Sequence, residues 1–500
     1  MHRVVQVSLL IIALVLLINT GLAWLLNGQP ALAATGGAST ASFLLLLPLG
    51  VMLINLSAMP LADRDTSVIG TVTTVWGVAI FAYFGVGFAF QFGGLAIGNP
   101  HIDFADLYWN WTPLETADAE YWGVVGLRGW ALLGAAGTAG IYDLFIRHLA
   151  LVGIVSVIPA FLLHRRVNVV GMILFGLLVG ALIYPIAGNW VWSSGWLSQL
   201  GRTLGLGHGF VDAGMATPFV LAGMMSLAIL RLFPTSSLDE SQSHSDTVSM
   251  PAEYLPYVSL FGLTMIIWGW TFIAQADHLP TAPPIVVPRT ALNGLLALVS
   301  GGLLSALYSR FVTGQFDLLM LVRGAVAGLV ALSTVAPFVV PWQAIAVGLV
   351  VGLVTPLLIY FVDHTVQLSD HTAAVAIFGL VGGLAWLLPG VLADGTTGIG
   401  WNGVGTSDYM GVQGQGVSGL FVQSGYGVDW PGQFNAQLVG AIAIIVWTYS
   451  LTYGLFWLYR GFATSLRNPS NEPEMSNLEQ ETTVSPTPSD DLHLSHDPNA

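Results

Sequence analysis

The sequence predicts an all-α polytopic membrane protein, and two observations support this class. Of its 500 residues, 54% are hydrophobic and only 8% are charged, and the mean hydropathy is +0.74. A water-soluble chain of this length needs far more charge to cover its surface. Apolar runs of about 18–25 residues recur along the chain, and this is the length that an α-helix needs to cross a bilayer. The lipid bilayer is therefore the first expected partner.

The first element is the apolar run within MHRVVQVSLLIIALVLLINTGLAWLLNGQPALAATGG. It has a basic start, and Ala31, Leu32 and Ala33 before Ala34 match a small-residue cleavage site. Residues 1–33 are therefore interpreted as a signal peptide. Because the run is long for a signal, an uncleaved extra N-terminal helix is the alternative.

Eleven further apolar segments follow, and each predicts a transmembrane helix. They lie at 42–60, 67–91, 139–163, 169–188, 213–231, 256–276, 289–308, 319–337, 340–362, 373–392 and 435–460. Together they predict one transmembrane domain over residues 42–460. The tail over residues 465–500 is rich in Ser, Pro, Asp and Glu and is expected to be disordered. The 59 glycines predict closely packed helices, because small residues let backbones approach each other.

Arginine sets the expected orientation, because the chain has no lysine and cytoplasmic loops are enriched in basic residues. If the N-terminus is outside, the arginines at cytoplasmic positions outnumber those outside. The cytoplasmic group is Arg64, Arg165, Arg166, Arg231, Arg310, Arg460 and Arg467, and the outer group is Arg128, Arg202 and Arg289. We predict a multi-pass protein of the cell membrane with a cytoplasmic C-terminus.

Composition also excludes several functions. The chain has no cysteine, so thiolate metal sites and cysteine nucleophiles are excluded. A net charge of −14 gives no reason to expect nucleic acid as a partner. No convergent catalytic set appears, so an enzyme is not expected, and neither is a cofactor. Two histidines and two aspartates resemble a metal cluster, but we interpret them as part of a solvated loop; they are Asp363, His364, Asp370 and His371.

Two segments share a pattern that predicts an internal repeat. In each, an aspartate near the helix start is followed seven or eight residues later by a phenylalanine, and four residues later by a glycine. The residues are Asp212, Phe219 and Gly223 in one segment, and Asp370, Phe378 and Gly382 in the other. The spacing places each phenylalanine about two turns inside the helix, near the bilayer midplane. Ten helices then divide into two sets of five with opposite orientation, as in many transporters. Two phenylalanines on packed helices are also compatible with an ordinary core.

Longer motifs resemble the ammonium transporter (Amt) family over roughly residues 42–460. They are YWGVVGLRGW, YPIAGNWVWSSGWL followed by GHGFVDAG, GAVAGLVALS, VLADGTTGIGWNGVG, GVSGLF and QFNAQLVGAIAIIVW. The resemblance implies an Amt/Rh-type fold of eleven helices in a five-plus-five inverted repeat. It also implies a homotrimer with one hydrophobic pore per subunit and ammonium or ammonia as the substrate. The family's C-terminal signature is absent, so a PII-type regulator is not expected as a partner.

The resemblance assigns roles to individual residues. Trp192 matches the vestibule tryptophan, whose ring face attracts cations, although an interfacial belt tryptophan is the alternative. Asp212 matches the aspartate that orders the vestibule and also fits an ordinary helix cap. The family places one histidine on each of helices five and ten, where they carry protons along the pore. Here Phe219 and Phe378 stand at those positions, and phenylalanine cannot accept a proton.

Other vestibule positions also differ from the family. Asp277 falls where the family has a vestibule serine, and Ile273 falls at a phenylalanine. In helix three, gate phenylalanines are missing and the polar pair Arg147 and His148 stands nearby. An ionisable residue at membrane depth suggests a function, whereas a later helix start would place both side chains in the wet vestibule. An ion pair from Arg147 to Asp277 or Asp143 is one expectation.

Three functions follow, and the first is preferred. It is ammonium or ammonia transport through an atypical pore lined by Phe219, Phe378, Arg147 and His148, with Trp192, Asp212 and Asp277 in the vestibule and Asp370 at the start of helix ten. The second is a non-transporting sensor or regulatory subunit that binds a ligand in the vestibule. The third is a channel for another small solute, with Asp277 and Arg147 as its polar groups.

Overall fold

The computed structural model describes residues 43–60, 64, 66–114, 119–134, 137–213, 216–234, 252–274 and 287–466. The predicted signal segment 1–33, Asp277 and nearly all of the predicted tail lie outside the described residues. The chain divides into a unit of residues 1–456 and a unit of residues 457–500. The description below concerns the first unit, apart from the C-terminal turns of the last helix.

Seven helical spans among the described residues are long and apolar enough to cross a membrane. They are Ser67–Gly98, Ala139–Leu163, Val169–Trp192, Leu255–Ile273, Val287–Thr313, Pro341–Thr365 and Gly432–Phe462. Four shorter apolar helices occupy other predicted segments: Leu46–Ala58, Ala216–Leu232, Leu318–Ser333 and Val375–Ala385. The prediction of a mainly helical chain with repeated membrane-spanning helices is therefore confirmed.

Several spans change helix type along their length. The elements, in chain order, are α3 (Leu46–Ala58), α4 (Thr66–Ala82), η3 (Tyr83–Gly87), α5 (Phe88–Phe92), α6 (Leu95–Gly98), α7 (Ala139–Leu163), α8 (Val169–Leu177), η8 (Leu178–Ile183), α9 (Tyr184–Trp192), α11 (Ala216–Leu232), α12 (Leu255–Ala274), α13 (Val287–Thr313), α14 (Leu318–Ser333), α15 (Pro341–Tyr360), η11 (Phe361–Thr365), η12 (Val375–Val381), α16 (Gly382–Ala385), α17 (Leu388–Leu392) and α18 (Gly432–Leu466). The segments η3, η8, η11 and η12 are π-helical, with wider turns than an α-helix.

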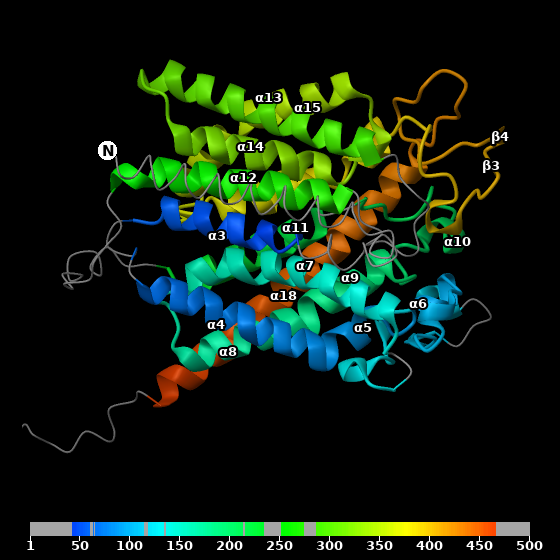
Figure 1. Ribbon diagram of the computed structural model, residues 1–500, viewed down its shortest axis with the longest axis horizontal. Coiled ribbons are helices and arrows are strands. Elements are labelled where there is room, and N and C mark those ends of the chain that lie inside the picture. The colour runs from blue at the N-terminus through cyan, green and yellow to red at the C-terminus, as the bar shows by residue number, and fades with distance from the viewer. Residues whose placement is uncertain are drawn as a thin grey trace, which may run out of the picture. The chain divides into compact units, whose positions relative to one another are not determined.

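Short elements fill the connections, and most of them gather at one end of the helices. They are η4 (Ile102–Phe104), β1 (Asn110–Trp111), η5 (Ala119–Trp122), β2 (Val125–Gly126), η6 (Trp130–Leu132), α10 (Leu200–Thr203), η9 (Ala252–Tyr254), η10 (Ala336–Phe338), η13 (Trp401–Gly403), β3 (Asp408–Tyr409) and β4 (Val412–Gln413). Strands β1 and β2 pair antiparallel, as do β3 and β4. Figure 1 shows α6, α10 and the β3–β4 hairpin together at one end, which we call the loop end. The turn at residues 314–317 between α13 and α14 marks the opposite end, which we call the far end.

Glycines allow several helix pairs to touch through their backbones, as the composition predicts. A Cβ on Gly50 of α3 would lie 2.5 Å from the Gly262 carbonyl oxygen on α12. A Cβ on Gly352 of α15 would lie 2.4 Å from the Gly301 carbonyl oxygen on α13. Such contacts are too close for any side chain, so these pairs depend on glycine.

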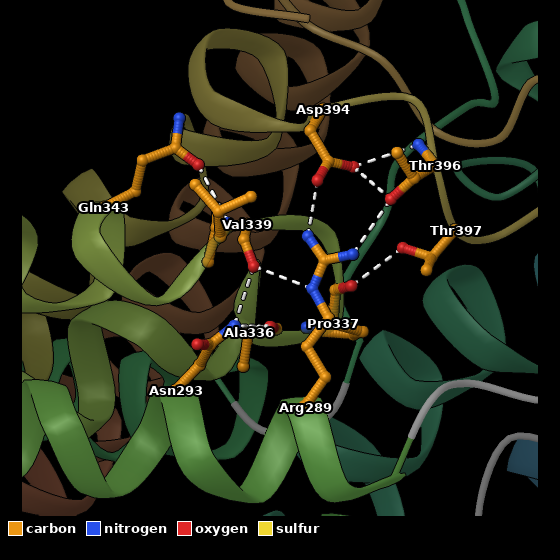
Figure 2. A network of polar contacts seen from close by, with 10 residues as sticks. Arg289, Asn293, Ala336, Pro337, Val339, Gln343, Asp394, Thr396 and Thr397 are labelled. Carbon is orange, nitrogen blue, oxygen red and sulfur yellow. Dashed lines mark hydrogen bonds and ion pairs between the residues drawn. The ribbon is translucent and has the colours of Figure 1, made fainter. Parts of the chain in front are cut away.

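A polar network fixes the loop end of α13 to its neighbours (Figure 2). Arg289 pairs with Asp394 and donates from Nε to the Val339 carbonyl at 2.8 Å and from a terminal nitrogen to Thr396 Oγ1 at 2.9 Å. Asn293, one turn further along α13, donates to the same Val339 carbonyl at 2.7 Å. The first turns of α13 thereby contact both the connection between α14 and α15 and the loop that follows α17.

Candidate functional site

Phe219 and Phe378 meet face to face inside the bundle. Their ring centroids are 5.3 Å apart and the ring planes differ by 11°. Only 1% of Phe219 and 3% of Phe378 is exposed. The two residues predicted from the repeat are therefore brought together, although they lie far apart in the sequence and belong to α11 and η12.

Equivalent aspartates start the two helices that carry the rings. Asp212 Oδ2 accepts a hydrogen bond from the Thr217 nitrogen at 2.8 Å, and Asp370 Oδ2 accepts one from the Val375 nitrogen at 2.7 Å. In both cases the bonded nitrogen lies five residues after the aspartate. Such bonds satisfy backbone donors that have no partner within the helix. The described geometry thus gives both aspartates a capping contact.

The two halves differ by one residue between the aspartate and the phenylalanine. The interval is seven residues from Asp212 to Phe219 and eight from Asp370 to Phe378. The second interval runs into the π-helical η12, whose wider turns accommodate an extra residue. The sequence pattern did not indicate this π-helix, because its composition is that of any apolar helix.

Glycines beside the rings bring the two helices into backbone contact. A Cβ on Gly223 would lie 2.1 Å from the Gly379 nitrogen, and one on Gly382 would lie 2.8 Å from Val220 Cγ2. The ring pair therefore lies beside a close backbone contact between α11 and η12. Neither ring can bind or carry a proton, so this contact is apolar on both sides.

A second cluster surrounds Trp192, the last residue of α9. Trp192 Nε1 donates to the Asp212 carbonyl at 3.2 Å, and only 2% of this residue is exposed. The His148 ring lies 5.9 Å from the Trp192 ring at an angle of 62°. Three residues predicted as site members, from α7, α9 and the start of α11, are thus neighbours. The tryptophan face is covered by protein rather than open.

His148 is fully buried and has polar and aromatic neighbours from two other spans. Its Nδ1 lies 2.6 Å from the Tyr184 hydroxyl and 3.1 Å from the Gln91 amide nitrogen. The Phe92 ring packs edge-on against it at 4.7 Å. Sequence reasoning missed Tyr184, Gln91 and Phe92, because helix packing alone brings these positions to His148.

Arg147 forms an ion pair with one of its two expected partners. Its Nε lies 2.7 Å from Asp143 Oδ2, one turn earlier on α7. The arginine is buried, whereas Asp143 keeps about a quarter of its side chain exposed. The alternative partner, Asp277, lies outside the described residues. The charge of Arg147 is therefore balanced within its own helix.

A small cavity of about 10 Å³ lies against Phe378. Besides apolar side chains of α3, α12 and α14, its lining includes Asn55, Arg323, Thr372 and Ile377. Sequence reasoning did not single out Arg323 or Asn55. The available signal was Arg323 itself, a charged residue inside the apolar segment predicted at 319–337.

A buried polar group at the loop end involves His208, between α10 and α11. Its ring centroid lies 4.6 Å from that of Tyr409, whose hydroxyl donates to Asp429 Oδ2 at 3.0 Å. Burial lowers the pKa of His208 to about 4 and raises the pKa of Asp429. Burial and the nearby Asp429 carboxylate also raise the pKa of Tyr409. His208 is therefore neutral at physiological pH.

Comparison with known protein families shows the family to which this chain belongs. The profile of the Ammonium Transporter Family matches residues 38–482, which is most of the chain. The chain belongs to the ammonium transporter family. One relative within the family is ammonium transporter Amt2 of Archaeoglobus fulgidus, 27% identical over 389 residues, covering 77% of this chain and 73% of the relative. Another is ammonium transporter 1 member 3 of Solanum lycopersicum, 24% identical, covering 76% of this chain and 77% of the relative.

Solved structures of ammonium transporter family proteins share the fold. A structure titled "Sensor Amt Protein" superposes with a TM-score of 0.65 at 18% identity, covering 87% of this chain and 94% of that one. Mep2 of Saccharomyces cerevisiae superposes with a TM-score of 0.62 at 19% identity, covering 84% and 85%. These likenesses concern the fold. Family membership together with the apolar spans identifies a multi-pass membrane protein, in a family of transporters rather than enzymes.

Nothing in the described part of this ammonium transporter family member groups three or more His, Asp or Glu side chains as a metal site would. His364 stacks on Tyr360 with ring centroids 4.2 Å apart. Asp370 caps the start of η12, as described above. Two of the four residues that resembled a metal cluster in the sequence, His364 and Asp370, are therefore engaged in other contacts.

Proposed function

We propose that this chain transports ammonium across the membrane as uncharged ammonia, along a path that passes Phe219 and Phe378. Membership of the ammonium transporter family supports ammonium transport as the activity. The observation that carries the uncharged route is the stacked pair, which offers two apolar faces and no titratable atom beside the contact of α11 with η12.

The physical reason is the cost of desolvating an ion. A charged group at membrane depth is expensive unless it is paired or hydrated. An ammonium ion that passed two buried phenylalanine rings would lose its water without gaining a hydrogen-bond acceptor. Ammonia carries no net charge, and so the same passage costs much less. The proton must then stay behind, since phenylalanine cannot carry it.

We assign five of the remaining predicted residues to the entrance. Trp192, Asp212 and Asp277 would form the vestibule, with Arg147 and His148 below them. Asp370, at the start of the second ring-bearing helix, would lie on the opposite side of the rings, toward the far end. The contacts of His148 with Trp192 and Tyr184 support a shared site for the first group. Phe219 and Phe378 would line the narrowest part of the path.

The proposed topology has eleven membrane helices in a five-plus-five inverted repeat. The seven long spans and the four shorter apolar helices among the described residues support this number. The matching contacts of Asp212 and Asp370 support the repeat. We further propose a cleaved signal at residues 1–33, an outer N-terminus, a cytoplasmic tail at residues 465–500 and a homotrimer in the cell membrane. The loop end would then face outward.

The test is flux and current in proteoliposomes that contain the purified protein. We expect an ammonium gradient to change the internal pH through ammonia entry, with no ammonium-dependent current on a supported membrane. The variant carrying both Phe219→His and Phe378→His is a positive control for current, because imidazoles can pass a proton where phenylalanine cannot. A sustained current in the wild type would overturn the uncharged route.

A non-transporting sensor is the second candidate, and the packing of His148 on Trp192 favours it. Only 2% of Trp192 is exposed, so this contact closes a path beside the tryptophan, and a ligand that binds there would have to open it. In a sensor, ammonium would shift the thermal unfolding midpoint of the wild type, and Trp192→Phe would reduce that shift. Ammonium binding that depends on Trp192, without ammonia or ammonium flux in proteoliposomes, would support the sensor over the transporter.

A further inference from the structure

The small cavity beside Phe378 contains a cation of the protein itself. Phe378 and Arg323 line the same space of about 10 Å³. Arg323 belongs to the second turn of α14, near the far end. A route that continues past Phe378 through this space toward the far end would therefore pass Arg323.

The guanidinium is held in place but keeps one donor unused. One terminal nitrogen donates to the His371 carbonyl at 2.5 Å, whereas Nε is buried and has no acceptor among the described residues. Three carboxylates interact electrostatically with Arg323: Asp370, Asp317 and Asp363. Asp370 also accepts from Thr372 Oγ1 and from the backbone of η12, and Asp317 caps α14. None of them accepts a hydrogen bond from Nε among the described residues, so this donor stays unused.

Asn55 of α3 adds a second unused donor on the cavity wall. Only 2% of this residue is exposed, and its amide nitrogen has no acceptor among the described residues. Buried donors without partners are rare in folded proteins and call for an explanation. A passing molecule with a lone pair would satisfy them.

We propose that Arg323 is the charge-selectivity residue of the path, admitting ammonia beyond Phe378 and excluding ammonium and hydrated protons. The proposal rests on the proposed function and adds a residue to it. Ammonia has a lone pair that can accept a hydrogen bond from Arg323 or Asn55. Ammonium has only donors and a positive charge, so neither the Arg323 donor nor the Asn55 donor can bind it. Positive groups in other selective pores exclude protons and cations by the same physics.

The experiment removes the ring and the charge separately. Phe378→Ala, Phe378→Ala with Arg323→Gln, and Phe378→Ala with Arg310→Gln are compared in proteoliposomes, by internal pH for ammonia entry and by current for ammonium. Arg310 is a matched control, because it is an exposed arginine near the far end of α13 that does not line the cavity. If Phe378→Ala does not fold, Phe219→Ala removes the other ring of the stack and takes its place.

We expect Phe378→Ala to admit ammonia without current. Adding Arg323→Gln should raise the ammonium current at least tenfold, and adding Arg310→Gln should leave it unchanged. The proposal is overturned if Phe378→Ala conducts ammonium with Arg323 intact, or if the two double variants behave alike. Absence of flux in every ring variant also overturns it, because the path would not run past Arg323. The proposed function is tested separately, by the internal pH change that an ammonium gradient causes in proteoliposomes with the wild-type protein.

Discussion

His208 illustrates how surroundings set the behaviour of a single residue. Its imidazole is buried at the loop end, and neither ring nitrogen has a hydrogen-bond partner among the described residues. A charged imidazole there would lose its hydration and gain no acceptor. Burial accordingly lowers the pKa of His208 to about 4, from an ordinary value of 6.5. Folding therefore competes with protonation of this residue.

The first prediction is a loss of stability in mild acid that depends on His208. Between pH 6.5 and about 4 the unfolded chain binds a proton at this residue and the folded chain does not, so stability falls as the pH falls. The full difference is about 3 kcal/mol. His208→Phe should remove this part of the pH dependence, as measured by thermal unfolding in detergent at pH 7.5 and pH 5.

The control is His101→Phe, which changes an exposed histidine at the same end of the protein. We expect it to keep the pH dependence of the wild type. Asp429, whose pKa is raised by burial, also contributes to the pH dependence of stability. Subtracting the pH dependence of the His208→Phe variant from that of the wild type removes most of this contribution. Equal pH dependence in the wild type and His208→Phe would contradict the prediction.

Individual contacts were predictable from the sequence only where the spacing constrained them. Asp143 and Arg147 lie one turn apart on a helix, so their ion pair was expected. The repeat predicted that Phe219 and Phe378 lie at the same depth, and the resemblance placed both along one pore, but neither predicted that the rings stack. The contacts of Gln91 and Tyr184 with His148 depend on how three spans rotate about their axes, and apolar composition does not fix that rotation. The cavity shared by Arg323 and Phe378 was missed for the same reason.

At the scale of elements, glycine determines which helices touch. The pairs α3–α12, α13–α15 and α11–η12 each include a glycine whose Cβ would clash with the backbone of the partner helix. Apolar runs predicted where helices lie, and the number of glycines predicted close packing. Which glycines face each other could not be derived, because the helices contain more glycines than contacts need. For example, a Cβ on Gly454 would meet nothing within 4 Å.

The second prediction concerns the helix contact beneath the rings. Gly223→Ala should lower the thermal unfolding midpoint, because its Cβ would lie 2.1 Å from the Gly379 nitrogen and the helices would have to separate. Overpacking of this kind costs about 1–3 kcal/mol or more. Gly383→Ala is the matched control, since its nearest neighbour would be Ile445 Cδ1 at 4.0 Å. Equal midpoints in the two variants would show that α11 and η12 can separate freely.

At the scale of the whole molecule, large apolar side chains remain exposed along α13 and α15. They include Leu303, Leu307, Val350 and Leu357. In a membrane protein such faces contact lipid or another subunit, and either environment removes them from water. The fold class was predictable because it depends on composition and run length. Assembly was expected only from the resemblance to the ammonium transporter family, since a single chain carries no direct signal of its symmetry.

The third prediction is therefore a homotrimer. Native mass spectrometry of the detergent-solubilised protein should give the mass of three chains, each 53.0 kDa before any signal is removed. The mass should persist at low protein concentration, because apolar faces of this size favour a permanent assembly. A mass of one or two chains under these conditions would contradict it.

The π-helical turn that carries Phe378 makes the ring stack sensitive to chain length. An α-helix rotates its side chains by about 100° for each residue. Deleting one residue between Asp370 and Phe378 could let η12 rewind as an ordinary helix, with the same interval as from Asp212 to Phe219. Inserting one residue after Asp212 would instead turn the Phe219 ring away from its partner. The eight-residue interval before Phe378 is therefore matched to the π-helical turn, and the seven-residue interval before Phe219 to an ordinary α-helix. Inserting or deleting one residue in either interval would disturb this helix crossing more than most single substitutions in the same helices.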